Sequence, residues 1–287
     1  MKAPIFIIGN PRSGTTLIRL MLTCHRNIMI PPECGFAVWW YLKYGEWKKS
    51  KLPEFIQDLM QSKKIDTWQI NEKSLLEFLR EKDPFSYSQL ISAVYEWYGL
   101  SRGRSFKRWG DKNNFHLNHI LTIKKLFPTA YFVHIIRDGR DVTCSYREVN
   151  ARKIQSLYAP NLPNKIDEIA EQWKTNVEMI NESFECIRWE NVYELKFEDL
   201  ILDTGRSLFN LCCWLGELYD PSMLNYHHIN RMRILEPVEF LKWKEHTLHP
   251  PVSSVVARHK RDLSMQEIGT FEMVAGDVLE RYGYLAC

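Results

Sequence analysis

The stretch that decides the fold is Ile5-Phe6-Ile7-Ile8-Gly9-Asn10-Pro11-Arg12-Ser13-Gly14-Thr15-Thr16, near the start of the chain. Its first four residues form a short, continuously apolar run, which predicts a buried strand. After the loop, apolar residues recur at helical spacing, at Leu17, Leu20 or Met21, and Cys24. The backbone N–H groups of a glycine-bearing loop and the positive end of the helix that follows it favour an anion. The stretch therefore predicts a strand, an anion-binding loop and a helix.

The same pattern recurs twice along the chain. The run 131–136 leads into the polar stretch 137–141, where Asp141 is expected to cap a helix that continues through Arg147. A third apolar alternation, over 192–197, precedes a helix that begins at Thr204 and stops at Gly216. Three strand-then-helix units predict an α/β, P-loop-like, three-layer fold with a central parallel sheet flanked by helices.

The length of 287 residues fits a single domain over 1–287. Residues 35–105 contain many aromatic side chains and few turn signals, so we expect a helical insertion over the edge of the sheet where the loops lie. Residues 166–180 have the apolar spacing of an amphipathic helix, and Ser264 with Glu267 forms a capping box that begins the last helix.

Composition excludes several classes of protein. Lys and Arg number 38 against 35 for Asp and Glu, a net charge of +3, so no general basic field predicts nucleic-acid binding. The apolar runs are far shorter than the ~20 residues that span a bilayer, so we expect no membrane segment. The seven cysteines are odd in number and never spaced C-x-x-C. Reduced thiols, a cytoplasmic location and no structural metal are expected.

The first loop has the pattern of a phosphate loop, but Thr15 stands where nucleotide hydrolases have a lysine, and Arg12 supplies a cation instead. Residues 11–16 resemble the 5′-phosphosulfate loop of sulfotransferases that use 3′-phosphoadenosine 5′-phosphosulfate (PAPS). Residues 136–142 with Ser145 resemble the 3′-phosphate motif of the same family. Arg137 at a strand end and Ser145 on the next helix can converge on one phosphate at the positive end of that helix.

Two later stretches resemble the same family. Residues 197–200, Phe-Glu-Asp-Leu, resemble its Y-E-D-L strand end, with phenylalanine in place of tyrosine, and 258–261 resemble its late basic cluster. The tryptophan that follows the first loop in cytosolic members is Leu17 here. The resemblance, with a hydroxyl contact expected from the serine pair 253–254, implies these cofactor-binding residues: Arg12, Ser13, Gly14, Thr15, Thr16, Arg137, Ser145, Phe197, Ser253, Ser254, Arg258, His259 and Lys260.

The resemblance also implies catalytic residues. Arg12 is expected beside the phosphosulfate, and Lys112 resembles the family lysine that reaches the sulfuryl group and the leaving oxygen. Asn114 stands where cytosolic members have a histidine base. Glu33 occupies the place of the glutamate base of the tyrosylprotein and glycan branch, with His116 and His119 held in reserve.

The function implied is transfer of the sulfuryl group from PAPS, without a metal, to a hydroxyl or amine of a small-molecule or glycan acceptor. Some aromatic residues between Phe36 and Trp47 are expected to line the acceptor site, and alkaloid tailoring is one option. One alternative is a nucleotide kinase or phosphotransferase, disfavoured by the missing loop lysine and by the Arg137 and Ser145 pair. The other is a nucleotide-binding module without catalysis, which would need neither Glu33 nor Lys112.

Overall fold

A five-stranded sheet in the order β2-β3-β1-β4-β5 lies at the centre of the computed structural model, which describes residues 1–285. The strands are β1 (Ile5–Ile8), β2 (Ile28–Met29), β3 (Arg108–Lys112), β4 (Tyr131–Ile136) and β5 (Val192–Lys196). Neighbouring strands pair in parallel. The three predicted strands are present as β1, β4 and β5, and the α/β prediction is confirmed.

The sequence did not predict β2 and β3. Strand β2 has only two residues, and β3 reads Arg-Trp-Gly-Asp-Lys, a polar segment without the apolar pattern of a buried strand. All five residues of β3 are nevertheless buried, because this strand lies inside the sheet between β2 and β1. Its register pairs Lys112 with Ile7 of β1. The last residue of β3 is therefore placed beside the first loop.

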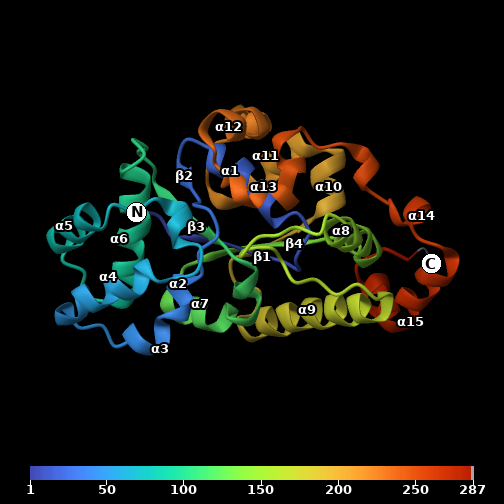
Figure 1. The fold of residues 1–287 in the computed structure, drawn as a ribbon, viewed down its shortest axis with the longest axis horizontal. Helices are drawn as coiled ribbons and strands as arrows, with labels where there is room; N and C mark the ends of the chain where they lie inside the picture. The colour runs from blue at the N-terminus through green and yellow to red at the C-terminus, as the bar shows by residue number, and fades with distance from the viewer. Residues whose placement is uncertain (286–287) are drawn as a thin grey trace.

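Helices cover both faces of the sheet (Figure 1). One layer contains α1 (Thr15–Cys24), α10 (Phe197–Leu202), α11 (Thr204–Leu215), α12 (Tyr226–Arg233) and α13 (Val238–Lys244). The opposite side carries α7 (Ile120–Leu126), α9 (Ile166–Cys186) and α15 (Met265–Arg281). Helices α8 (Gly139–Ala151) and α14 (His259–Asp262) lie on the side of the view that holds the C-terminus. The 3₁₀ segments are η1 (Lys49–Lys51), η2 (Ile65–Trp68), η3 (Asn114–Asn118), η4 (Pro221–Asn225), η5 (Glu245–Leu248) and η6 (Ser253–Val255).

The alternation of side chains along β1 divides the apolar core into two parts. Ile5 and Ile7 pack with α1 and α11, whereas Phe6 and Ile8 belong to the cluster on the opposite face. All four residues are almost completely buried. The strand is thus apolar throughout because both of its faces are covered, as expected for a parallel sheet.

The insertion between the first two units is helical, as the sequence predicted. It contains α2 (Phe36–Trp39), α3 (Tyr41–Tyr44), α4 (Leu52–Met60), α5 (Glu72–Lys82) and α6 (Tyr87–Leu100), which gather at one end of the sheet beyond β3 (Figure 1). Its aromatic rings pack on one another: Tyr95 stacks on Phe36, with ring centroids 5.6 Å apart, and on Trp109, at 4.2 Å. The aromatic content of this insertion therefore builds a core.

One predicted helix cap is wrong. Asp138, not Asp141, caps α8, because its side chain accepts a hydrogen bond from the Arg140 N–H at 2.9 Å. The predicted capping box of Ser264 and Glu267 is present, and α11 ends at Gly216 in the left-handed conformation. Within residues 1–285, none of the helices has the length and apolar character needed to cross a membrane.

Candidate active site

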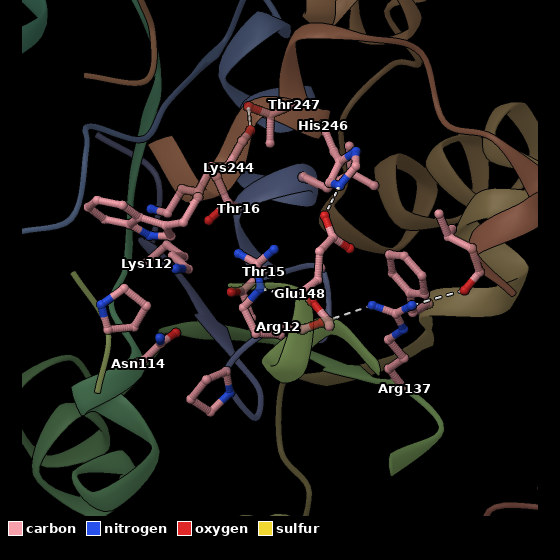
Figure 2. Close-up of a pocket in the computed structure, with 18 of the residues that line it drawn as sticks. Arg12, Thr15, Thr16, Lys112, Asn114, Arg137, Glu148, Lys244, His246 and Thr247 are labelled. Atoms are coloured by element: carbon pink, nitrogen blue, oxygen red, sulfur yellow. Dashed lines mark hydrogen bonds and ion pairs between the residues drawn. The ribbon is translucent and has the colours of Figure 1, made fainter. Parts of the chain in front are cut away.

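The main cavity lies at the carboxyl ends of the parallel strands, where ligands bind in open α/β sheets. Its volume is about 640 Å³. Figure 2 shows Lys112, Asn114 and Lys244 at one side of the cavity and Arg137 at the other, with Arg12 and Thr15 between them. The cavity thus has a lysine-rich end and an arginine-rich end.

The first loop follows β1 and enters the cavity before α1. Gly14 has a φ of 99°, and a Cβ at this position would lie 2.5 Å from the Phe197 ring, so the loop needs glycine here. Arg12 also adopts positive φ, 69°, which is uncommon for a residue with a side chain. Thr15 and Thr16 line the cavity at the start of α1, where backbone N–H groups have no partner within the helix. This end of α1 can bind an anion.

The second loop brings the Arg137 side chain to the same cavity, next to Arg12 of the first loop. Arg12 Nε donates to Ser145 Oγ at 3.1 Å, and Arg137 donates to the backbone oxygens of Arg12, at 3.2 Å, and Val255, at 2.9 Å. The Arg137 guanidinium lies 4.3 Å from the Phe197 ring centroid. Burial and the neighbouring Arg137 lower the pKa of Arg12 to about 10. An anion would relieve the repulsion between these two cations.

The late basic cluster is only partly in the cavity. Arg258 lines it and donates to Glu148 at 3.0 Å. His259 is buried beneath it, where its Nδ1 lies 2.7 Å from Asp141 Oδ1. Lys260 is exposed and outside the cavity lining.

Three serines expected to contact the cofactor also lie outside the lining. Ser253 and Ser254 are exposed on η6, and Ser13 is fully buried in the first loop. The other members of the predicted cofactor-binding set do line the cavity: Arg12, Gly14, Thr15, Thr16, Arg137, Ser145, Phe197 and Arg258.

Glu33 and Lys112 meet at the opposite end of the cavity. Both side chains are buried, and Lys112 Nζ donates to Glu33 Oε1. Two further lysines contact the same carboxylate: Lys244 Nζ lies 3.1 Å from Oε1, and Lys64 Nζ lies 2.6 Å from Oε2. Glu33 is therefore surrounded by three ammonium groups.

The charges around Glu33 decide its protonation state. Burial alone would raise the pKa of Glu33, but the three lysines outweigh it and hold that pKa well below the ordinary 4.5. Burial lowers the pKa of Lys112 to about 8, although Glu33 opposes this shift. The carboxylate is thus ionised at neutral pH.

No sequence pattern singled out the remaining charged residues at this end. Lys244 also contacts Glu236, with Nζ 2.6 Å from Oε1, and Glu236 in turn pairs with Arg19 of α1. Lys64 lies on the helical insertion, before η2. These residues belong to no motif, and charged side chains in polar segments are ordinarily solvated, so only the fold reveals their burial.

Several candidates for the acceptor side are not in the cavity. His116 is completely buried and its Nε2 lies 2.8 Å from Asp111 Oδ2, whereas His119 packs on Phe115, with ring centroids 4.1 Å apart. Neither histidine lines the cavity. None of the aromatic residues between Phe36 and Trp47, which were expected at the acceptor site, lines this cavity, and most of their rings pack in the core of the insertion. The aromatic residues that line the cavity are Tyr158, Phe197, Tyr226 and Trp243.

Across residues 1–285, no three or more His, Cys, Asp and Glu side chains are grouped so that they could hold a metal ion.

Comparison with known proteins adds a family. A family model described as "Sulfotransferase family" matches residues 4–221. Protein-tyrosine sulfotransferase A of Caenorhabditis elegans is 23% identical over 225 residues, covering 78% of this chain and 53% of that protein. Omega-hydroxy-beta-dihydromenaquinone-9 sulfotransferase Stf3 of Mycobacterium tuberculosis is 25% identical over 256 residues, covering 78% and 66%. This chain therefore spans about half to two thirds of the length of these relatives.

Solved structures with the same fold cover almost the whole chain. The sulfotransferase domain from the curacin biosynthetic pathway has a TM-score of 0.63 at 18% identity, covering 97% of this chain and 98% of that one. The sulfotransferase domain from the Synechococcus PCC 7002 olefin synthase has a TM-score of 0.60 at 21% identity, covering 96% of each. At such low identity these similarities establish the fold alone.

The three lysines around Glu33 imply that removing the Glu33 charge lowers the free energy of unfolding by an amount that depends on pH. Glu33→Gln leaves Lys112 and Lys64 without a carboxylate and Lys244 with Glu236 alone, so we expect unfolding at pH 7 to require about 3–5 kcal/mol less. Because the folded pKa of Glu33 is depressed, its stabilising contribution is present above the ordinary pKa of 4.5 and is lost as the pH falls through the lower, folded value. The difference between wild type and variant should shrink below about pH 4.5. Urea unfolding at pH 7 and pH 4 measures it, and an equal difference at both pH values would contradict the depressed pKa.

Proposed function

The chain belongs to the sulfotransferase family, and on this premise we propose that it transfers the sulfuryl group of PAPS to a hydroxyl of a small-molecule or glycan acceptor. The observation that carries the proposal is the joining, in one cavity, of two anion-binding loops and a buried carboxylate-lysine pair. A nucleotide carrying phosphates at both its 3′ and 5′ positions suits two separate anion sites.

The arginine-rich end suits the 3′-phosphate. Arg137 and Ser145 both contact Arg12, and all three line the cavity close to the start of α8. Arginine binds phosphate in a bidentate manner, and the positive end of α8 adds to the attraction. The start of α1, at Thr15 and Thr16, is left for the 5′-phosphosulfate. Arg258 can add a cation if its contact with Glu148 opens.

The lysine-rich end suits the chemistry. The acceptor oxygen attacks the sulfur, the bond from sulfur to the 5′-phosphate oxygen breaks, and the hydroxyl proton passes to Glu33. Lys112 can turn from Glu33 towards the leaving oxygen, where negative charge develops. This turn removes one of the three cations from the carboxylate and so makes Glu33 a stronger base. Arg12, whose side chain lies with Ser145 here, is proposed to assist from the other side of the transferred group.

A second acceptor class is a tyrosine side chain of a protein, which the names of several relatives favour. A panel of a phenol, an aliphatic alcohol, a sugar and a tyrosine peptide, each incubated with PAPS and assayed for the 3′,5′-bisphosphate product PAP, separates the two classes. Turnover confined to the peptide would replace the small-molecule proposal.

We predict that the chain binds PAP far more tightly than ATP, because ATP has no 3′-phosphate for Arg137 and Ser145. Arg137→Ala should remove a charge-assisted contact of about 1.5–3 kcal/mol, so PAP affinity should fall about tenfold to more than a hundredfold. Arg261→Ala is the matched control, since Arg261 is exposed and outside the cavity lining. Titration calorimetry decides the matter, and equal affinity for PAP and ATP would favour a kinase.

Catalysis is predicted to need no divalent metal, since the sulfuryl group carries less charge than a phosphoryl group and Lys112 stabilises the leaving oxygen. EDTA should leave turnover unchanged, and Lys112→Ala should lower kcat roughly a hundredfold. Lys260→Ala, at an exposed position, serves as the control. Loss of activity in EDTA with recovery in Mg²⁺ would support a phosphotransferase instead.

Glu33→Gln is predicted to lower kcat by about 10²–10⁴-fold, because a positioned general base is lost. PAP affinity should change little, since Glu33 contacts Lys112, which lies on the side of the cavity opposite Arg137 (Figure 2). His119→Ala is the control, as His119 lies outside the cavity. Near-normal kcat in Glu33→Gln, with a dead histidine variant, would remove Glu33 from the mechanism.

A further inference from the structure

Lys244 lies between two buried carboxylates. Its Nζ is 2.6 Å from Glu236 Oε1 and 3.1 Å from Glu33 Oε1, and its side chain is only 7% exposed. Lys244 is the last residue of α13, and its Nζ lies 4.9 Å from the Phe240 ring centroid. The Lys244 ammonium is therefore held from three sides, and Glu33 is one of them.

Glu236, the second carboxylate that contacts Lys244, is anchored to α1, the helix that follows the first loop. Glu236 pairs with Arg19 of α1, and both side chains are almost completely buried. Arg19 also donates to the backbone oxygens of Ile30 and Leu235, each at 3.1 Å. Burial opposes ionisation of Glu236, yet Lys244 and Arg19 together lower its pKa. Alternating charges thus run from Arg19 through Glu236 and Lys244 to Glu33.

The other two cations around Glu33 differ from Lys244 in role or in exposure. Lys112 has a separate task in the proposed reaction, because it must turn towards the leaving oxygen. Lys64 is more exposed, at 17%, and lies on the insertion in the left-handed conformation, with a φ of 71°. When Lys112 turns away, Lys244 is the buried cation that remains on Glu33 Oε1.

We infer that Lys244, braced by Glu236 and Arg19, is a positioning residue that keeps Glu33 ionised and in place while Lys112 contacts the transferred group. This inference rests on the proposed function. The charged groups that face Glu33 are Lys112 from β3, Lys64 from the segment before η2 and Lys244 from α13, with the Glu236 carboxylate behind Lys244. The acceptor hydroxyl is then left to approach Glu33 at Oε2, whose partner is the more exposed Lys64.

The first test reads Glu33 directly. The full chain, labelled with ¹³C at the glutamate carboxyl carbons and saturated with PAP, is titrated with acid and followed by NMR, with the Glu33 signal assigned from its loss in Glu33→Gln. In Lys244→Met the Glu33 titration should move upward by about one to three pH units, because an opposite charge within contact distance is lost. Lys244→Arg should restore the wild-type titration, and Lys64→Met should give a smaller shift.

The second test is kinetic and uses PAPS with an acceptor returned by the panel. Lys244→Met should lower kcat at least about tenfold, because Glu33 is no longer held in place beside the acceptor, while the Kd for PAP stays within about threefold of wild type. Its acidic limb in the plot of kcat against pH should move to higher pH, and Lys244→Arg should recover most of the loss.

Failure of this inference and failure of the proposed function give different experimental results. An unchanged Glu33 titration in Lys244→Met would overturn the inference, even if the variant is less stable. If Lys244→Met does not fold, the variant Lys244→Met/Glu236→Gln removes one charge of each sign and is titrated in its place against Glu236→Gln alone. Failure of the wild type to bind PAP would instead overturn the proposed function on which the inference rests.

Discussion

The buried ion pair between Glu33 and Lys112 determines which other charges the cavity needs. A carboxylate buried in a cavity that must receive an anionic donor repels that donor unless cations neutralise it. Three lysines do so here, and they leave the lysine-rich end with a net positive charge. Buried ion pairs add little stability by themselves, but removing one partner is costly. The charges are thus arranged for binding and chemistry more than for stability.

The parallel sheet makes this arrangement possible, because the carboxyl ends of its strands meet at one edge. Lys112 ends β3, the first loop follows β1, and Arg137 follows β4. Phe197 begins α10 directly after β5 and closes against Gly14 of the first loop. Residues separated by more than a hundred positions are brought together without any long-range motif. The cations at the two ends of the cavity come from different strands and helices, which keeps the two groups of cations apart.

The parts of the site that could be predicted are those with a local signal. The loop at Gly14 and the pair Arg137 and Ser145 are motifs in which glycine or charge stands at fixed spacing after a strand. Strand β3 could not be predicted, because it is polar and buried only by its neighbours. Proximity in sequence does not by itself place a residue in the cavity: Ser253, Ser254, His259 and Lys260 lie near Arg258, yet none of these four lines it.

The charged residues that no sequence pattern revealed share one physical explanation. Lys64, Lys244 and Glu236 meet Glu33 or one another only after the insertion, α13 and the sheet edge have packed together. Each taken alone is a charged side chain in a polar segment, where solvent exposure is the ordinary outcome. The aromatic residues of the insertion show the opposite case. An aromatic-rich segment suggests a binding pocket, but it can equally form a core, as most of these residues do here.

The position of PAP in a crystal structure of this chain would show whether the two ends of the cavity act as proposed. We expect the 3′-phosphate against Arg137 and Ser145 and the 5′-phosphate at the N–H groups of Thr15 and Thr16. We also expect Lys112 to turn towards the 5′-phosphate while Lys244 still contacts Glu33. A nucleotide bound with its 3′-oxygen far from Arg137, or outside the cavity, would contradict the account.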